Sequence, residues 1–391
     1  MNDREVVKEA ILNMQNNNLL IELPTGHGKT AIALELLKKK LQKGRVLVVV
    51  PRIVLKQNFI LEVDKWWESC PLDFTLTTYR SLYKYIGDWD AVIYDEVHHM
   101  TPKCIEAAKN IHSKYSLFLS ATVPQKLREE LGKLYDNLGY YKRTAREAID
   151  NGVLPDPKVY LLPLELDNTV SSEVIIKNPN CKNTIETDWK YRWNYIGKNA
   201  KLIIHCTKMQ FIADLNAQIE WYKQKYLITR SKSLRNRWLK LCGDRLKILS
   251  NWRTKYSLAI LKQFKDYRTL TFCNSITQTE ILGKYCINSK NKKSQEILDK
   301  FNEGKIKHIT ACNMLDEGIN LANCRIGVYA SLNSSERLIK QKLGRLLRHE
   351  HPILVIPYFK NTREEEIAKT MLLDYNPELV TSIKSIEEII L

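Results

Sequence analysis

The first 155 residues alternate short apolar runs with helical stretches. The runs have the length of strands and end at polar or turn-forming residues; they read LLIEL, VLVVV, FTLTTY, AVIYD and SLFLS. Strands that alternate with helices in this way form a parallel sheet with helices on both faces. The pattern predicts a doubly wound α/β domain over residues 1–155.

The same rhythm returns near the C-terminus. Pro155 and Pro157 suggest an extended crossover, and a second set of strand-like runs follows, reading RTLTFC, KHITAC, RIGVYA and ILVIPY. We therefore predict a second α/β domain over residues 156–391. With 391 residues, the chain is long enough for each domain to bury a core of its own.

The segment 183–268 lacks this alternation and reads as helical. It contains 19 Lys and Arg and 6 Asp and Glu, a net charge of +13 out of +17 for the whole chain. It also holds five of the eight Trp residues, most of which we expect to be core residues because they recur at helical spacing. Basic residues interleaved with aromatic ones favour a nucleic-acid partner, and we expect Arg235, Arg237 and Lys240 to contact it.

Residues 21–30, IELPTGHGKT, join an apolar strand to a glycine-rich turn and a helix. This order predicts a phosphate-binding loop with Lys29 on the β- and γ-phosphates and the Thr30 hydroxyl on Mg²⁺. The helix that follows presents its N-terminus to the same anion. The expected nucleotide-binding residues are Thr25, Gly26, His27, Gly28, Lys29 and Thr30.

A second apolar strand ends in acidic residues, in AVIYDEVHH at 91–99. Doubly wound sheets bind their ligands at the carboxyl ends of the strands. We assign Asp95 to the Mg²⁺ ion and Glu96 to the attacking water.

The remaining composition argues against a disulfide-linked, zinc-binding, secreted or membrane-spanning protein. The nine cysteines form no C-x-x-C pair, which indicates core thiols in a reducing compartment rather than disulfides or zinc ligands. The N-terminus is a polar amphipathic segment without a signal peptide, and the longest apolar run, 46–50, is too short to cross a bilayer. We expect a cytoplasmic protein, in the host cytoplasm if the source is a virus.

Taken together, the motifs resemble those of a superfamily 2 helicase of the DExH type. Eight of them follow in the family's order: LPTGHGKT, VVVPRIVLKQNF, TTYRSL, DEVHH, Ser-Ala-Thr at 120–122, LTFCNSI, LDEGINL and QKLGRLLR. The resemblance implies two tandem RecA-like domains with ATP between them, and makes segment 183–268 a basic insertion in the second domain. It also implies nucleic-acid contacts by Pro51, Arg52, Gln57, Thr78, Tyr79, Arg80, Asn274 and Ser275.

The resemblance implies further roles around the nucleotide. Gln341, Arg345 and Arg348 would act from the second domain, with the arginines on the γ-phosphate. Gly318 and Asn320 would link nucleotide state to nucleic-acid contact, and Arg4 would lie near the base. His98, Ser120 and Thr122 would couple hydrolysis to movement. The family's adenine-reading glutamine is replaced by Val7, although ATP remains the expected nucleotide.

The residue patterns DEVHH and Q-x-x-G-R-x-x-R are more similar to those of DNA-acting than of RNA-acting relatives. The composition suggests a phage or a low-GC bacterium as the source. We therefore expect an ATP-dependent DNA translocase or helicase. Two alternatives stay open from the sequence: an RNA-acting remodeller, and a nucleic-acid-binding protein with little strand-separating activity. Protein partners, oligomeric state and direction of travel are not encoded in any motif.

Overall fold

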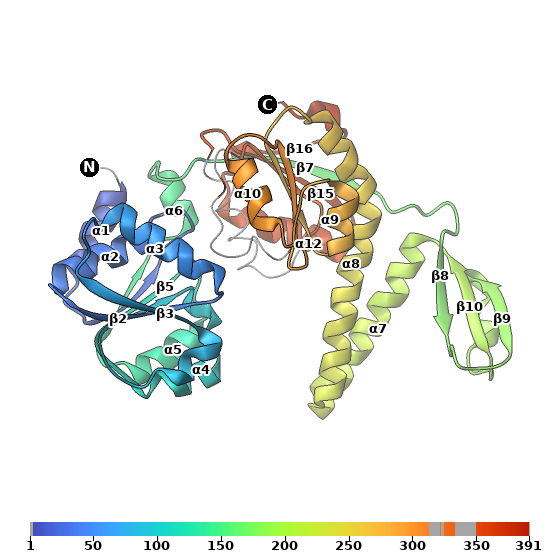
Figure 1. The fold of residues 1–391 in the computed structure, drawn as a ribbon. Helices are drawn as coiled ribbons and strands as arrows, with labels where there is room; N and C mark the ends of the chain where they lie inside the picture. The colour runs from blue at the N-terminus through green and yellow to red at the C-terminus, as the bar shows by residue number, and fades with distance from the viewer. Residues whose placement is uncertain (1–2, 313–320, 322–323, 333–348, 391) are drawn as a thin grey trace.

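The computed structural model describes residues 3–312, 321, 324–332 and 349–390. Two parallel sheets dominate these residues, each within a lobe of its own (Figure 1). The doubly wound α/β class predicted from the sequence is confirmed.

The first lobe holds a six-stranded sheet in the order β3-β2-β4-β5-β1-β6, with every pair parallel. Its strands are β1 (Asn18–Glu22), β2 (Gly44–Val50), β3 (Leu72–Thr78), β4 (Gly87–Asp95), β5 (Ile111–Ser120) and β6 (Leu138–Lys142). One face packs on α1 (Asp3–Leu12), α2 (Lys29–Lys40) and α3 (Val54–Trp66). The other face packs on η1 (Tyr79–Lys84), η2 (Val97–His99), α4 (Pro102–Ala108) and α5 (Gln125–Leu134).

The second lobe holds a seven-stranded parallel sheet in the order β12-β13-β11-β14-β15-β7-β16 among the described residues. Its strands are β7 (Lys158–Leu164), β11 (Thr269–Cys273), β12 (Cys286–Ile287), β13 (His308–Cys312), β14 (Ile326–Tyr329), β15 (Ile353–Phe359) and β16 (Val380–Ser382). The helices around it are α9 (Ile276–Leu282), α10 (Ser294–Asn302), α12 (Arg363–Met371), η4 (Leu372–Asp374), η5 (Pro377–Leu379) and η6 (Ile386–Glu388). The short helix α6 (Ala145–Asp150) precedes Pro155, yet Ala148 and Ile149 pack into this lobe's core.

The middle of the chain differs from the helical prediction in its first part. Residues 173–206 form a small sheet of β8 (Glu173–Lys177), β10 (Lys201–Cys206) and β9 (Thr184–Asp188), with η3 (Trp189–Tyr195) in the last connection. Alternate residues of β10 are buried, which is the period-2 pattern of a sheet with one covered face. The expected helix begins only at Lys208.

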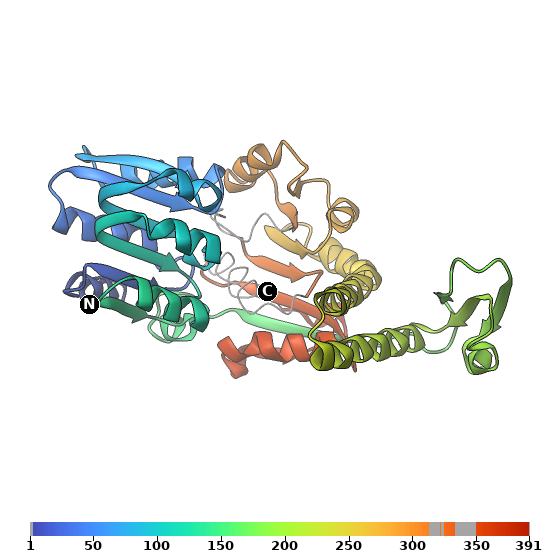
Figure 2. The ribbon, with the colours of Figure 1, turned by 90° about the horizontal axis from the view of Figure 1, so that it is seen from below.

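Two long antiparallel helices follow the small sheet, α7 (Lys208–Thr229) and α8 (Lys232–Gln263). Thr207 caps α7 with its side chain in a capping box with Gln210. The second half of α8 packs on the second lobe, where Leu249, Ile260 and Leu261 are core residues. Figures 1 and 2 show the α7–α8 hairpin projecting from this lobe, with the small sheet on the side of α7 away from both lobes.

The nine cysteines are free thiols, and six of them are buried, as expected of core residues. None of the helices that the structure describes is both long enough and apolar enough to cross a membrane.

Candidate nucleotide-binding site

The phosphate-loop sequence folds as a turn between β1 and α2. Gly26 and Gly28 have φ angles of +90° and +88°, a backbone conformation that glycine adopts without steric cost. Gly28 directly precedes α2, which has no side-chain cap and no acidic residue in its first turn. A helix start of this kind presents backbone N–H groups and a partial positive charge to an anion.

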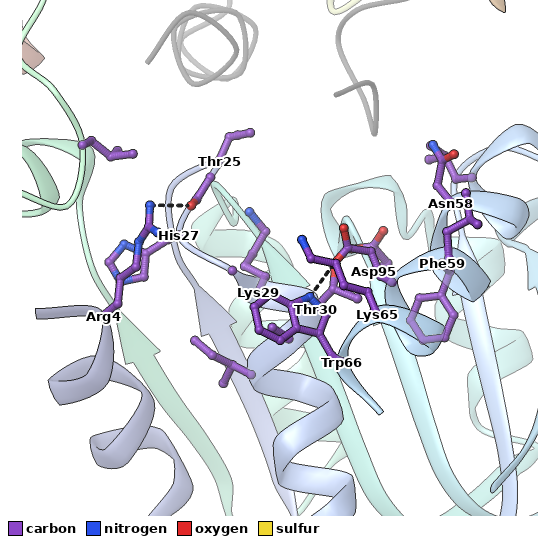
Figure 3. A pocket seen from close by; sticks show the side chains of 18 of the residues that line it. Arg4, Thr25, His27, Lys29, Thr30, Asn58, Phe59, Lys65, Trp66 and Asp95 are labelled. Atoms are coloured by element: carbon purple, nitrogen blue, oxygen red, sulfur yellow. Dashed lines mark hydrogen bonds between the residues drawn. The ribbon is translucent and has the colours of Figure 1, made fainter. Parts of the chain in front are cut away.

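Lys29 is held over this turn by its own loop. Its Nζ donates a hydrogen bond of 3.0 Å to the carbonyl of Leu23, the residue where the strict motif has glycine. Thr30 lies one position further along α2, and Asp95 ends the neighbouring strand β4 (Figure 3). The predicted Mg²⁺ residues thus line one cleft, and a hydroxyl and a carboxylate are the hard oxygen ligands that this ion takes.

Glu96 has a strained backbone and a buried side chain. Its φ of +48° is left-handed, which is uncommon for a residue with a Cβ and occurs preferentially at functional sites. The His98 Nδ1 atom lies 3.3 Å from Glu96 Oε2 and 2.9 Å from Ser120 Oγ. Ser120 Oγ in turn donates to the carbonyl of Thr122 at 2.8 Å.

The structure therefore connects Glu96, one of the predicted catalytic residues, to the three predicted coupling residues. His98 and Ser120 join the end of β4 to the end of β5, and Thr122 lies in the segment that leaves β5. A change at Glu96 has a direct route to that segment through two side chains. No such link follows from spacing in the sequence, because the two strand ends are more than twenty residues apart.

The cleft has a volume of about 1250 Å³ and is lined from both lobes. The first lobe contributes the phosphate loop, Asp95 and Glu96, and the second contributes Ile287 and residues of α10. His349 and Glu350 also line it, and they directly follow Arg348 in the chain. Gln341, Arg345, Arg348, Gly318 and Asn320 themselves lie outside the described residues.

His27 is the most unusual side chain of the loop. It is only 2% exposed, and neither ring nitrogen has a hydrogen-bond partner among the described residues. Its pKa is lowered to about 4, mainly by burial; Asp3 raises the pKa, and the cationic Arg4, Lys29 and Arg143 lower it. The ring is therefore neutral at physiological pH.

Arg4 lies at the edge of the same loop. Its guanidinium donates long hydrogen bonds of 3.4 Å to the carbonyls of Gly26 and Val153. It thus joins the phosphate loop to the connector between the lobes. Val7, which replaces the expected glutamine, is completely buried in the core under α1.

Comparisons with known proteins agree with this geometry. The family model for the res subunit of type III restriction enzymes matches residues 2–125, and the model for the conserved C-terminal helicase domain matches residues 252–350. The DNA 3'-5' translocase XPB2 of Sulfurisphaera tokodaii is 26% identical over 355 residues, which cover 84% of this chain and 74% of that protein.

The chain is a superfamily 2 helicase. Proteins of this superfamily hydrolyse ATP, so this helicase is an ATP-hydrolysing enzyme.

Two solved structures share the helicase's fold. The helicase domain of Pyrococcus furiosus Hef has a TM-score of 0.52 at 13% identity, covering 94% of this chain and 97% of that one. The type ISP restriction-modification enzyme LlaBIII bound to DNA has a TM-score of 0.56 at 13% identity and covers 98% of this chain. The helicase spans only 31% of the length of LlaBIII. The predicted tandem RecA-like architecture is confirmed.

Sequence reasoning missed the outer half of the helicase's cleft. Helix α3 contributes Asn58, Glu62, Lys65 and Trp66, and α10 faces it with residues that include Asp299. Trp66 is half exposed and donates a hydrogen bond of 2.8 Å to Glu62, and the Lys65 ammonium lies 4.9 Å from its ring. An exposed tryptophan at the end of an amphipathic helix was the available signal, but only the fold places α3 opposite α10.

The residues predicted to contact nucleic acid have different surroundings. Arg52, Gln57 and Arg80 are exposed, while Pro51, Thr78, Asn274 and Ser275 are half-buried. Tyr79 is buried, and its hydroxyl donates to the Asp95 carbonyl at 2.8 Å, so it supports the end of β4 rather than lying on the surface. Ser275 caps α9 by accepting from the Gln278 N–H.

The hairpin of the helicase carries the predicted basic residues. Arg235, Arg237 and Lys240 are all exposed on the first half of α8. Of the five tryptophans in segment 183–268, Trp193 and Trp221 are exposed, and the others pack partly against apolar clusters as predicted.

Proposed function

We propose that this helicase is an ATP-dependent translocase of the DExH type that acts on DNA and separates or remodels strands. The observation that carries the proposal is the two-sided cleft, in which the phosphate loop and the Asp95–Glu96 pair face the second lobe. The similarity to the DNA 3'-5' translocase XPB2 supports DNA as the substrate and that direction of travel. The nine free thiols support a reducing, cytoplasmic compartment.

In this proposal the two lobes are the ATPase units, 1–155 and 156–391, with α6 packed on the second. Lys29 and the backbone of the loop bind the phosphates, and Thr30 with Asp95 would hold Mg²⁺. The ion would supply charge neutralisation between the β- and γ-phosphates. Glu96 orients the attacking water, since its side chain lines the cleft at the end of β4.

Hydrolysis would then reach the nucleic acid through contacts between the ends of β4 and β5. His98 and Ser120 connect Glu96 to Thr122, so loss of the γ-phosphate can shift the segment after β5. Arg345 and Arg348 would complete the site from the second lobe, as implied by His349 at the cleft wall. Because the two lobes supply different parts of the site, turnover requires their closure.

The proposed nucleic-acid-binding surface has two parts. The first lobe offers Arg52, Gln57 and Arg80, and the α7–α8 hairpin offers Arg235, Arg237 and Lys240. Replacing the last three by glutamine should reduce the slope of log affinity against log salt by up to about 3, since each phosphate contact contributes roughly 0.9. An unchanged slope would remove the hairpin from the binding surface.

The test of the function is ATP hydrolysis measured with single-stranded, duplex and forked DNA and with matched RNA. We expect stimulation by DNA that exceeds stimulation by RNA, and loss of all turnover in Lys29→Ala. Stronger stimulation by RNA would contradict the DNA assignment. Turnover on forked DNA without strand displacement would limit the activity to translocation.

A further inference from the structure

The connection between β9 and β10 carries a run of aromatic residues that the ATPase mechanism does not use. Residues 189–198, WKYRWNYIGK, contain four rings within seven positions, all of them in η3. We call these ten residues the aromatic segment. They close the small sheet at the end of the molecule farthest from the first lobe (Figures 1 and 2).

The rings of the aromatic segment divide into two pairs. Trp189 and Tyr195 pack against the core of the small sheet, which is formed by Ile175, Leu202, Ile204 and Cys206. Tyr191 and Trp193 lie between them in sequence and stay outside that core, with 50% and 67% of their surfaces exposed. The fold therefore gains nothing from burying Tyr191 and Trp193, and an exposed cluster of this kind marks an interaction site.

Cations lie over these rings. The Arg192 guanidinium is 3.6 Å from the Trp189 ring centre and 4.6 Å from that of Trp193, and it donates to the Trp189 carbonyl. The Lys190 ammonium is 4.5 Å from the Tyr191 ring centre. Such cation–π contacts fix the exposed rings in place before any ligand arrives, which lowers the entropy lost on binding.

The charge around the rings is mostly positive. No acidic residue occurs between 189 and 201, whereas Lys190, Arg192, Lys198 and Lys201 are all basic. The adjoining strand carries two carboxylates: Asp188, which directly precedes the segment and attracts Lys190, and Glu186, which is paired with His205. A ligand that meets this surface therefore needs negative charge together with flat apolar faces.

We propose that the aromatic segment is an auxiliary binding site for single-stranded DNA, in which unpaired bases stack on Trp193 and Tyr191 and lysines contact the phosphates. Base pairs in a duplex hide their faces in the stack, so only unpaired bases can use these rings. The inference rests on the proposed function for its choice of DNA. It adds a strand-binding site that is separate from the two lobes.

The neighbouring hairpin extends the same chemistry. Trp221 on α7 is 54% exposed, with the Lys225 ammonium 5.7 Å from its ring centre. Arg237 of α8 lies 5.8 Å from the Tyr222 ring centre. Helix α7 also packs on β8, so the small sheet is attached to the hairpin that carries these residues.

The test uses the full chain without nucleotide and compares Trp193→Ala with Trp193→Phe, which keeps a stacking ring. Fluorescence anisotropy gives the affinity for labelled oligothymidylate, oligouridylate and a blunt DNA duplex. Loss of one stacked base should weaken single-strand binding by roughly 5- to 150-fold in Trp193→Ala and far less in Trp193→Phe, with duplex binding unchanged. Leu373→Ala, which removes an exposed apolar side chain elsewhere, should bind like the parent.

Two outcomes would overturn the inference. Equal affinity of the parent and Trp193→Ala for oligothymidylate would exclude stacking and leave a protein partner as the use of the rings. Tighter binding of oligouridylate would overturn the choice of DNA. Quenching of tryptophan fluorescence by oligothymidylate, larger in the parent than in Trp193→Phe, gives a second measurement. A parent that binds single strands through Trp193 but whose ATPase no DNA stimulates would contradict the proposed function alone.

Discussion

The root of the α7–α8 hairpin is fastened by a buried ion pair, and we expect its disruption to destabilise the second lobe. Arg253 and Glu364 are both fully buried, and Arg253 Nη1 lies 2.6 Å from Glu364 Oε2. Arg253 also donates from Nε and Nη2 to the Ala330 carbonyl at 3.1 and 2.9 Å. One side chain thus joins α8, the end of β14 and α12.

The variant Arg253→Met keeps the apolar stem and removes the charge. The Ala330 carbonyl still accepts from Ser250 Oγ at 3.1 Å and from Gln278 Nε2 at 3.3 Å, so its loss is small. Glu364 keeps the hydrogen bond from the Phe359 N–H, at 3.2 Å, and becomes a buried charge without a counter-ion. Leaving such a charge costs about 3–5 kcal/mol.

The assay is thermal unfolding followed by circular dichroism, with and without nucleotide to identify the transition of the first lobe. The cost corresponds to a decrease of roughly 6–20 °C in the Tm of the second-lobe transition. Burial already raises the pKa of Glu364, and Arg253 opposes that rise. Without Arg253, the Glu364 carboxyl binds a proton more readily in the folded state than in the unfolded state. The loss of stability in Arg253→Met should therefore grow as pH rises above 4.5.

The matched control is the double variant Arg253→Met with Glu364→Leu, which replaces both charges by apolar groups. It should recover most of the lost stability, since a buried pair is worth little more than good apolar packing. A double variant that is no more stable than Arg253→Met, or a deficit independent of pH, would refute the reasoning that the orphaned Glu364 carboxylate is the cause.

Three further predictions concern the cleft. Glu96→Gln should bind ATP and DNA normally but hydrolyse ATP about 10²–10⁴-fold more slowly; normal turnover would show that another group orients the water. Arg345→Ala should reduce the catalytic rate by about 10³–10⁵ while nucleotide affinity is retained, and an unchanged rate would place the arginine finger elsewhere. His27 keeps its neutral form in the fold, so its contribution is complete above pH 6.5 and is lost as pH falls toward 4. The parent should therefore lose up to about 3 kcal/mol relative to His27→Ser over that range, measured as the difference in stability between pH 7 and pH 4.

The parts of this structure that the sequence predicts best are those in which chemistry and local structure coincide. A phosphate loop needs glycines, a lysine and a helix start within ten residues, and all of them appear in one stretch around Gly28. The strand that delivers Asp95 is apolar because both of its faces are covered, and this makes it easy to recognise. Local constraints of this kind are present in the order of the residues itself.

The small sheet was not predictable for the opposite reason. Its strand β9 reads TIETD and β8 reads EVIIK, so each is short and mostly exposed. Strand β8 pairs with β10 antiparallel, and β9 pairs with β10 parallel. These pairings join segments up to about thirty residues apart in the sequence. Neither hydrophobic period nor composition specifies such partners, and the high charge of the segment made a helical interpretation attractive.

The buried second half of α8 determines how the hairpin can move relative to the second lobe. Charge alone assigns the whole segment 183–268 to an insertion, but Leu249, Arg253 and Ile260 bury the second half of α8 inside the second lobe. A helix that is continuous from Lys232 to Gln263 cannot bend freely at its root, so the first half must follow the lobe. Closure of the lobes on a nucleotide would then move the basic face of the hairpin and the aromatic segment together with the second lobe. Because the hairpin is long, a small movement at the cleft would become a larger displacement of a DNA strand bound to the hairpin.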